Sequence, residues 1–427
     1  NASYTYDDKY VLSGSIRWDR SNLWGTNSKY QNKPLWSVGG SWNIYKEKFF
    51  QADFVDMLKL RASYGIGGNI GRNTAPYLIA SYYDSSLVDG MAGSVNTPPN
   101  KDIRWEKTTT VNVGVDFALF RHRLSGTIEY YNKYSVDLLA AINGSPTQGF
   151  GYTTLMTNNG KMVNRGVEIT LSGEIIRQKD FSWNASLLYA FNRNKVKHIS
   201  VQPSLWDSRI SMPTSYPMVG KPLYGIYAYK WAGLNENGDP QVYDAENNVT
   251  SGPARDYHAL VYCGTTVPIH NASLTNVLRY KGFEFSAMLI LDAGHKLRSS
   301  NIPSINMSNG RITSTAKGIV DRWTQPGDVT DVPRLLFSND TENFNTHRTE
   351  LYRYSDLFVY DASNIRLSNI SLAYRVPAHW CKKISLSGAR LQFNVENVAT
   401  FAFDSKANYD LGGKVKPNYV WGLYLNF

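Results

Sequence analysis

Apolar and polar residues alternate strictly along many segments of about ten residues, and this period constrains the fold more than any other feature of the chain. Side chains of a β-strand point alternately to opposite faces, so each such segment has one apolar face and one polar face. No stretch approaches the ~20 consecutive apolar residues of a membrane-spanning helix. The sequence therefore predicts an all-β protein. The first example has Tyr10, Leu12, Gly14, Ile16 and Trp18 on one face and Ser13, Ser15, Arg17 and Asp19 on the other.

Two all-β architectures fit this alternation. In a soluble β-sandwich, such as an adhesin, the apolar faces meet a second sheet. In an outer-membrane barrel they meet lipid, and the polar faces line the lumen. Small polar residues fill the polar faces, and the aromatic residues, 13% of the chain, gather at segment ends where membrane-interface girdles lie. Short turns also alternate with long loops, so the pattern favours a transmembrane antiparallel β-barrel.

Working back from the C-terminus, the pattern predicts fourteen strands, with every long loop on one side. Ala2 to Tyr6 resembles the tail of a further strand. Changes of phase predict β-bulges near Ser368 and Gly388, because one extra residue exchanges the two faces of a strand. The predicted strands are 8–19, 34–45, 57–66, 105–118, 121–135, 161–175, 180–193, 222–234, 239–245, 269–281, 282–293, 363–376, 383–397 and 417–427.

The chain thus begins inside a sheet, and an open sheet edge does not persist in lipid. Either the fourteen strands close on themselves or further strands precede them, and the partial strand at the start favours the second alternative. At the other end, alternating apolar residues finish on a terminal aromatic, which is typical of the signal that bacterial barrel-assembly machinery recognises. The residues of this predicted signal are Tyr419, Trp421, Leu423, Leu425 and Phe427.

Short motifs lie along the whole chain. They include Lys9–Arg17 (KYVLSGSIR), Trp36–Trp42 (WSVGGSW), Leu58–Gly65 (LKLRASYG), Ile103–Lys107 (IRWEK), Asn112–Asp116 (NVGVD), Met162–Glu168 (MVNRGVE) and Asn364–Tyr374 (NIRLSNISLAY). Together these motifs resemble those of SusC/RagA-type TonB-dependent transporters of Bacteroidetes, and they are specific jointly although each is weak alone. In a loop, Asp19–Gly25 departs from the family pattern.

This resemblance implies a 22-stranded barrel of the bacterial outer membrane. Residues 1–427 would be its C-terminal part, without the N-terminal plug and first strands. It also implies import of oligosaccharides or oligopeptides, a SusD-like lipoprotein lid, and energy from TonB–ExbB–ExbD acting through the absent N-terminal part. Outer-membrane lipid and lipopolysaccharide would surround the barrel. A TonB-dependent siderophore or vitamin transporter is the alternative within the same architecture.

No catalytic or metal-binding constellation is evident, so neither enzyme activity nor a cofactor is expected. The seven histidines lack metal-ligand spacing, and Cys263 and Cys381 form no pattern. Asn235, Asn237 and Asp239 have the spacing of a calcium loop, but two amides replace carboxylates and a turn is favoured. The net charge of +10 is scattered, which argues against a nucleic-acid groove.

Aromatic side chains in the long outer loops are the candidate substrate-binding residues. Their rings can stack on sugars or on peptide side chains. The alternative is that they pack against one another or against a partner. These residues are Tyr82, Tyr83, Phe150, Tyr152, Trp206, Tyr216, Trp323 and Phe344, while Arg17, Arg61, Glu129 and Glu168 are expected on the lumen face.

Overall fold

The computed structural model describes most of the 427 residues. The described part excludes 20–26, 28–29, 31–33, 72–75, 87–89, 145–146, 148–153, 204–207, 253–255, 308–314, 338–345 and 412–415.

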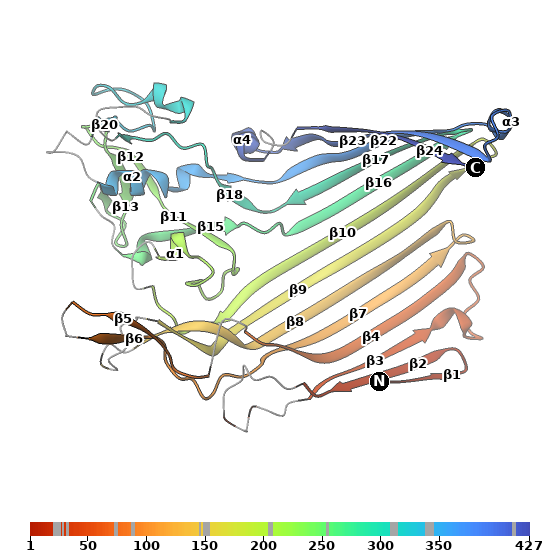
Figure 1. The fold of residues 1–427 in the computed structure, drawn as a ribbon, viewed down its shortest axis with the longest axis horizontal. Coiled ribbons are helices and arrows are strands. Elements are labelled where there is room, and N and C mark those ends of the chain that lie inside the picture. The colour runs from red at the N-terminus through yellow and green to blue at the C-terminus, as the bar shows by residue number, and fades with distance from the viewer. Residues whose placement is uncertain are drawn as a thin grey trace.

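Thirteen antiparallel strands form one large sheet in which nearly all neighbours follow chain order (Figure 1). We call it the main sheet. Its strands, in spatial order, are β1 (Ala2–Tyr6), β2 (Tyr10–Arg17), β3 (Leu35–Asn43), β4 (Val55–Asn69), β7 (Glu106–Leu119), β8 (Leu124–Asn143), β9 (Thr154–Arg177), β10 (Phe181–His198), β16 (His270–Tyr280), β17 (Phe283–Ala293), β22 (Asn364–Arg375), β23 (Gly388–Ala402) and β24 (Asn418–Asn426).

Short connections lie at one end of the main sheet, which we call the turn end, and long ones at the other, the loop end (Figure 1). Turns 7–9, 120–123, 178–180 and 281–282 lie at the turn end, next to the C-terminus. Residues 199–269 and 294–363 connect strands at the loop end. This separation of short and long connections is the one that the sequence predicted for a bacterial outer-membrane barrel.

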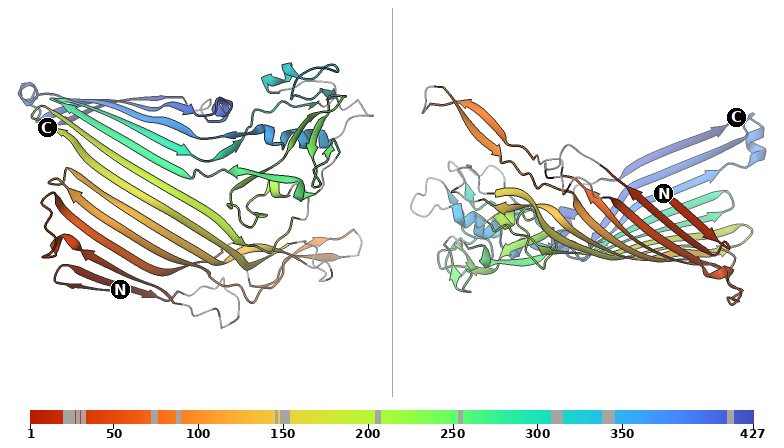
Figure 2. Two further views of the ribbon diagram at one scale, coloured as in Figure 1. Left: turned by 180° about the vertical axis from the view of Figure 1, so that it is seen from behind. Right: turned by 90° about the horizontal axis from the view of Figure 1, so that it is seen from below.

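The two faces of the main sheet differ in polarity along the full width. Tyr10, Leu12 and Ile16 are exposed on the apolar face, whereas Ser13 and Ser15 lie on the polar face. Figures 1 and 2 show a single curved layer of strands, and no second sheet covers it within the described part of the chain. A sandwich buries its apolar faces against a second layer. The membrane-barrel prediction is therefore confirmed and the sandwich alternative is rejected.

Smaller elements gather at the loop end. None of the helices in the described residues is long and apolar enough to cross a membrane. The small strand groups are β5 (Ile79–Asp84) with β6 (Met91–Thr97), β11 (Gly225–Tyr229) with β15 (Leu260–Thr265), β12 (Trp231–Leu234) with β13 (Pro240–Tyr243) and β14 (Val249–Thr250), β18 (Lys296–Arg298) with β21 (Val359–Asp361), and β19 (Asn306–Met307) with β20 (Leu336–Phe337). The helices are α1 (Ser208–Ser211), α2 (Thr346–Arg353), α3 (Ala378–Lys382), which lies at the turn end, and α4 (Asn408–Leu411).

The loop-end elements from α1 to β21 pack into a unit with its own core, which we call the loop-end unit. One cluster joins Tyr227, Tyr229 and Leu351, and a second joins Ile305 and Tyr352. Strand β11 is buried at every position. These loops are therefore a folded body held by apolar burial rather than separate excursions of the chain.

The loop-end unit corrects two of the predicted strands. Segments 222–234 and 239–245 do not enter the main sheet but form β11, β12 and β13. Successive residues of β11 are all buried, so neither face of the strand meets lipid. The main sheet consequently has thirteen strands, twelve from the predicted set plus the partial strand β1.

Of the two predicted bulges, the one near Ser368 is confirmed. Strand β17 pairs Met288 with Asn369 and Leu289 with Leu367, so the ladder skips Ser368. The bulge near Gly388 is wrong, because β23 begins at that residue. The preceding apolar residues belong to the turn after α3, where the carbonyl of Cys381 accepts hydrogen bonds from the N–H groups of Ile384 and Leu386.

We predict that Gly126→Val impairs barrel folding. A Cβ at Gly126 would lie 2.5 Å from the backbone oxygen of Thr170 and 2.8 Å from the Phe117 ring. Backbone cannot move aside as a side chain can, so we expect a loss of about 1–3 kcal/mol from overpacking. Gly14→Val is the control, since the nearest atom to its Cβ lies at 3.8 Å. Heat-modifiable gel migration measures the folded fraction, and equal fractions for both variants would contradict the prediction.

Candidate functional site: the polar face and its loop end

A charged cluster crosses three strands on the polar face. Arg61 of β4 donates from Nε to Asp116 of β7 at 2.7 Å, and its Nη2 also contacts Glu129 of β8. Thr127 donates to the same aspartate at 3.0 Å. One arginine thus holds two carboxylates on neighbouring strands. This arrangement confirms that Arg61 and Glu129 share a face, and it leaves the cluster with a net negative charge.

The polar face of β2, β3 and β4 is hollowed by small residues. One depression of about 220 Å³ is lined by Ser13, Gly39 and Arg61, among others. A second, of about 620 Å³, extends toward the loop end past Ser37 and Gly65. The polar side of the wall is therefore open enough to admit water or another chain segment.

Near the loop end, β8 changes phase at Asp137. This residue has a φ of 56°. Its carboxylate accepts a hydrogen bond from Arg104 at 2.7 Å, and its carbonyl accepts one from Asn158 at 2.7 Å. The ladder between β8 and β9 shifts on both sides of Leu138. The phase change turns Leu138 and Ala140 toward the face that carries Gly160 and Met162.

The phase change creates a cavity that we call the mouth pocket, because it lies on the polar face at the loop end. Its volume is about 330 Å³. Gly160 opens its floor, since a Cβ there would lie 3.1 Å from Cβ of Leu138. Apolar residues form most of the lining, and five polar or charged residues complete it. The lining includes Leu138, Ala140, Met156, Met162, Val196, Ile199, Pro217 and Leu223, together with the polar residues Glu106, Lys161, His198, Thr214 and Ser215.

Residues 208–223 form one side of the mouth pocket, and their C-terminal part is fixed to β10. Val196 exchanges backbone hydrogen bonds with Gly220 and Lys221, each of 2.9 Å. The N–H of Leu223 donates to the Asn194 side chain at 2.8 Å. These bonds hold the segment against the wall, so the pocket is preformed rather than dependent on a loose loop.

A buried ion cluster joins three parts of the loop-end unit. The Asp239 carboxylate accepts hydrogen bonds from Arg334 at 2.8 Å and from Arg348 of α2 at 2.6 Å. Burial lowers the pKa of Arg348, and the nearby carboxylate opposes that shift. The predicted turn is confirmed, because Asn235 Oδ1 accepts hydrogen bonds from the N–H groups of Asn237 and Asp239. Asp239 therefore serves as an anchor between loops.

Four of the eight predicted aromatic residues lie in the described part of the chain, two on the β5–β6 hairpin and two in the loop-end unit. Tyr82 and Tyr83 are 72% and 53% exposed on the β5–β6 hairpin. Tyr216 is only 8% exposed, and Trp323 packs over Gly238 in the loop-end unit. Phe150, Tyr152, Trp206 and Phe344 lie outside the described residues. Substrate contact by any of the eight stays a prediction.

The C-terminal residues of the predicted barrel-assembly signal are exposed in the structure. Tyr419, Trp421, Leu423 and Leu425 of β24, the last strand of the main sheet, and Phe427 directly after it are all at least 40% exposed. Recognition by assembly machinery stays a prediction.

Sequence reasoning did not identify the mouth pocket. A signal was present, because residues 138–142 (LLAAI) are apolar at every position and the alternation fails there. A continuous apolar run indicates a strand that is covered on both faces. The sequence does not reveal which segment covers this run, because the covering residues 208–223 are distant in the chain.

We predict that Asp239→Asn loosens the loop-end unit without unfolding the main sheet. The side chain of Arg348 is 3% exposed, and removing a buried ionic partner costs about 3–5 kcal/mol. Limited proteolysis of the folded protein should then cleave within 230–350. Glu350→Gln is the control, because its pairing with His347 is at the surface. Equal protease resistance of the two variants would contradict the anchoring role.

Comparison with known proteins agrees with this architecture. Residues 1–398 match the family model described as "TonB dependent receptor-like, beta-barrel". A TonB-dependent receptor of Formosa agariphila is 27% identical over 99% of this chain and 43% of its own length. The TonB-dependent receptor SusC of Bacteroides thetaiotaomicron is 25% identical over 92% of this chain and 39% of its own length.

A solved structure shows the same fold. The RagAB peptide transporter aligns with a TM-score of 0.79 at 23% identity, covering 100% of this chain and 47% of that one. The chain thus spans less than half the length of the proteins it resembles. The resemblance seen in the sequence motifs is confirmed: the chain belongs to the TonB-dependent receptor-like β-barrel family, whose place is the bacterial outer membrane.

Proposed function

We propose that this chain is the C-terminal wall of a SusC/RagA-type importer that carries oligopeptides into the periplasm. The mouth pocket is the observation that carries the proposal. In this reading a SusD-like lipoprotein covers the loop end and delivers substrate. TonB, with ExbB and ExbD, supplies force through a plug that belongs to the rest of the protein.

The edges of the main sheet support a longer protein. Strands β1 and β24 each have one neighbour within the described residues, and each leaves a row of backbone groups on its outer side. In lipid such groups need partners, at a cost of several kcal/mol for each one left unmade. Further strands between β24 and β1 would pair with these backbone groups. The larger barrel that the family resemblance implies contains such strands.

The lining of the mouth pocket favours peptide over glycan. A sugar carries a hydroxyl on most of its carbons, and each buried hydroxyl needs a hydrogen-bond partner. Leu138, Met162 and Val196 offer none. An aliphatic side chain needs no such partner and gains from burial against these residues. The polar groups at the edge of the pocket, such as exposed Lys161, suit the backbone or a charged end of a peptide.

The glycan alternative rests on the exposed aromatic residues of the β5–β6 hairpin. Tyr82 and Tyr83 are adjacent in β5, so their rings point to opposite faces of the hairpin. They cannot form one stacking platform for a sugar. Apolar burial in the mouth pocket is the better supported mode of recognition.

Uptake by cells that produce the full-length protein tests the proposal. We expect import of oligopeptides that contain Leu, Ile or Val, and no import of oligosaccharides. Ala140→Phe, which fills the pocket, should reduce peptide uptake about tenfold or more, because the ring displaces a side chain whose burial contributes about 1.5–3 kcal/mol.

Ala190→Phe is the matched control. Ala190 pairs with Glu168 on the polar face and does not line the pocket, so its variant should import peptides at the normal rate. Oligosaccharide import that is insensitive to Ala140→Phe would overturn the peptide assignment.

A further inference from the structure

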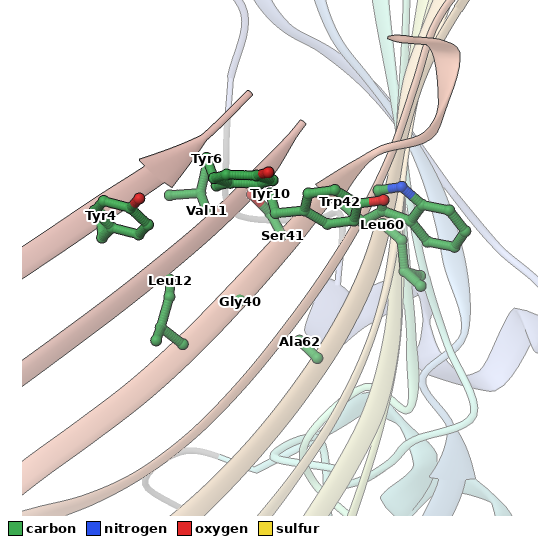
Figure 3. A pocket seen from close by; sticks show the side chains of 10 residues that line it. All are labelled: Tyr4, Tyr6, Tyr10, Val11, Leu12, Gly40, Ser41, Trp42, Leu60 and Ala62. Atoms are coloured by element: carbon green, nitrogen blue, oxygen red, sulfur yellow. The ribbon is translucent and has the colours of Figure 1, made fainter. Parts of the chain in front are cut away.

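The apolar face carries a notch near its turn end, in the first strands of the chain. A row of paired residues crosses β1 to β4 in the order Tyr4, Leu12, Gly40 and Ala62. Gly40 and Ala62 are small and lie beside the larger Tyr4 and Leu12, so the surface is recessed over β3 and β4. Figure 3 shows Tyr4 and Leu12 on one side of Gly40, with Trp42 and Leu60 at the turn-end side. The resulting groove holds about 400 Å³.

The turn-end wall of the groove is an aromatic row. Tyr6, Tyr10 and Trp42 lie side by side with ring centroids 6.4 and 6.3 Å apart. The hydroxyl of Tyr10 and the Nε1–H of Trp42 both donate to Glu47, which lies in the β3–β4 connection. Rings with an apolar body and a hydrogen-bonded polar tip are typical of a membrane–water boundary. The groove therefore opens into hydrocarbon just inside this boundary.

Charges of both signs lie beyond the aromatic row. Lys46 and Lys48 are exposed in the β3–β4 connection. The side chains of Asp7 and Asp8, in the β1–β2 turn, are 62% and 81% exposed, and Asp7 is paired with Lys9 Nζ at 2.8 Å. Lys46 Nζ lies 3.7 Å from Asp8, so cations and anions share one small area. Such a rim complements a headgroup that carries a phosphate and an ammonium group together.

We propose that this groove is a binding site for a zwitterionic phospholipid of the inner leaflet. One acyl chain lies over Gly40 and Ala62, the phosphate faces Lys46 and Lys48, and the ammonium group faces Asp8, the more exposed of the two aspartates. We assign the inner leaflet because the groove lies near the turn end, and the short turns and chain termini of bacterial barrels face the periplasm. This site does not depend on which substrate the barrel imports.

Native mass spectrometry of the full-length protein tests the groove. After delipidation, palmitoyl-oleoyl phosphatidylethanolamine is added back. Gly40→Leu should bind about tenfold less of it, the loss that displacement of two chain methylene groups causes. Gly14→Leu is the matched control: it places the same side chain on the same face, outside the groove, with its nearest neighbour atom 3.8 Å from the new Cβ. Equal binding by the two variants overturns the site.

The headgroup is tested in the same assay. Replacing Lys46 and Lys48 by Gln should weaken binding about fivefold for each lysine lost. Lys179→Gln with Lys281→Gln is the control, since both lysines are exposed in other short turns. The wild type should prefer phosphatidylethanolamine to phosphatidylglycerol. Equal retention of both lipids, or preferential retention of lipopolysaccharide, overturns the proposal.

Discussion

Every backbone N–H and C=O group that enters the hydrocarbon interior of a membrane must find its partner within the protein. Between its two edge strands, the main sheet meets this requirement with one continuous series of antiparallel pairings from β1 to β24. Because strand pairing uses the backbone hydrogen-bonding groups, only the side chains contact the surroundings. They must suit lipid on one face of the sheet and water on the other. The alternating sequence, the paired charges around Arg61 and the aromatic row at Tyr10 and Trp42 all follow from that division.

Segments that depart from the regular strand pairing of the main sheet lie largely at the loop end. There Asp137 and Asn158 interrupt the alternation, and the interruption opens the mouth pocket. Beyond it the chain folds by ordinary burial, with Tyr227, Tyr229 and Leu351 in a closed core and Asp239 bound by two arginines. A rigid wall thus supports a compact outer unit, and the pocket lies where the two meet.

Much of this arrangement was predictable from the sequence, and the exceptions have a common cause. Strands such as β2, β3 and β16 have one lipid face, so period two alone locates them. Segment 222–234 was wrongly assigned to the barrel because β11 is buried on both faces. Burial by segments distant in the chain leaves no periodic pattern in the sequence. For the same reason the exposure of Tyr82 and the burial of Tyr216 are indistinguishable in the sequence, where both are loop aromatics. The bulge near Gly388 was wrongly predicted because the chain forms α3 after Pro377, and Ile384 and Leu386 belong to the turn that follows this helix rather than to β23.

If neighbouring residues of one strand face lipid and water in turn, labels placed along β7 must report the two solvents alternately. Single cysteines replace Thr110, Val111, Asn112 and Val113 in the full-length protein, with Cys263 and Cys381 changed to serine, and each carries a polarity-sensitive fluorophore in lipid bilayers. We expect acyl-chain nitroxides to quench the labels at Val111 and Val113, while a water-soluble quencher reaches those at Thr110 and Asn112. Uniform quenching by either reagent along the strand would contradict this alternation.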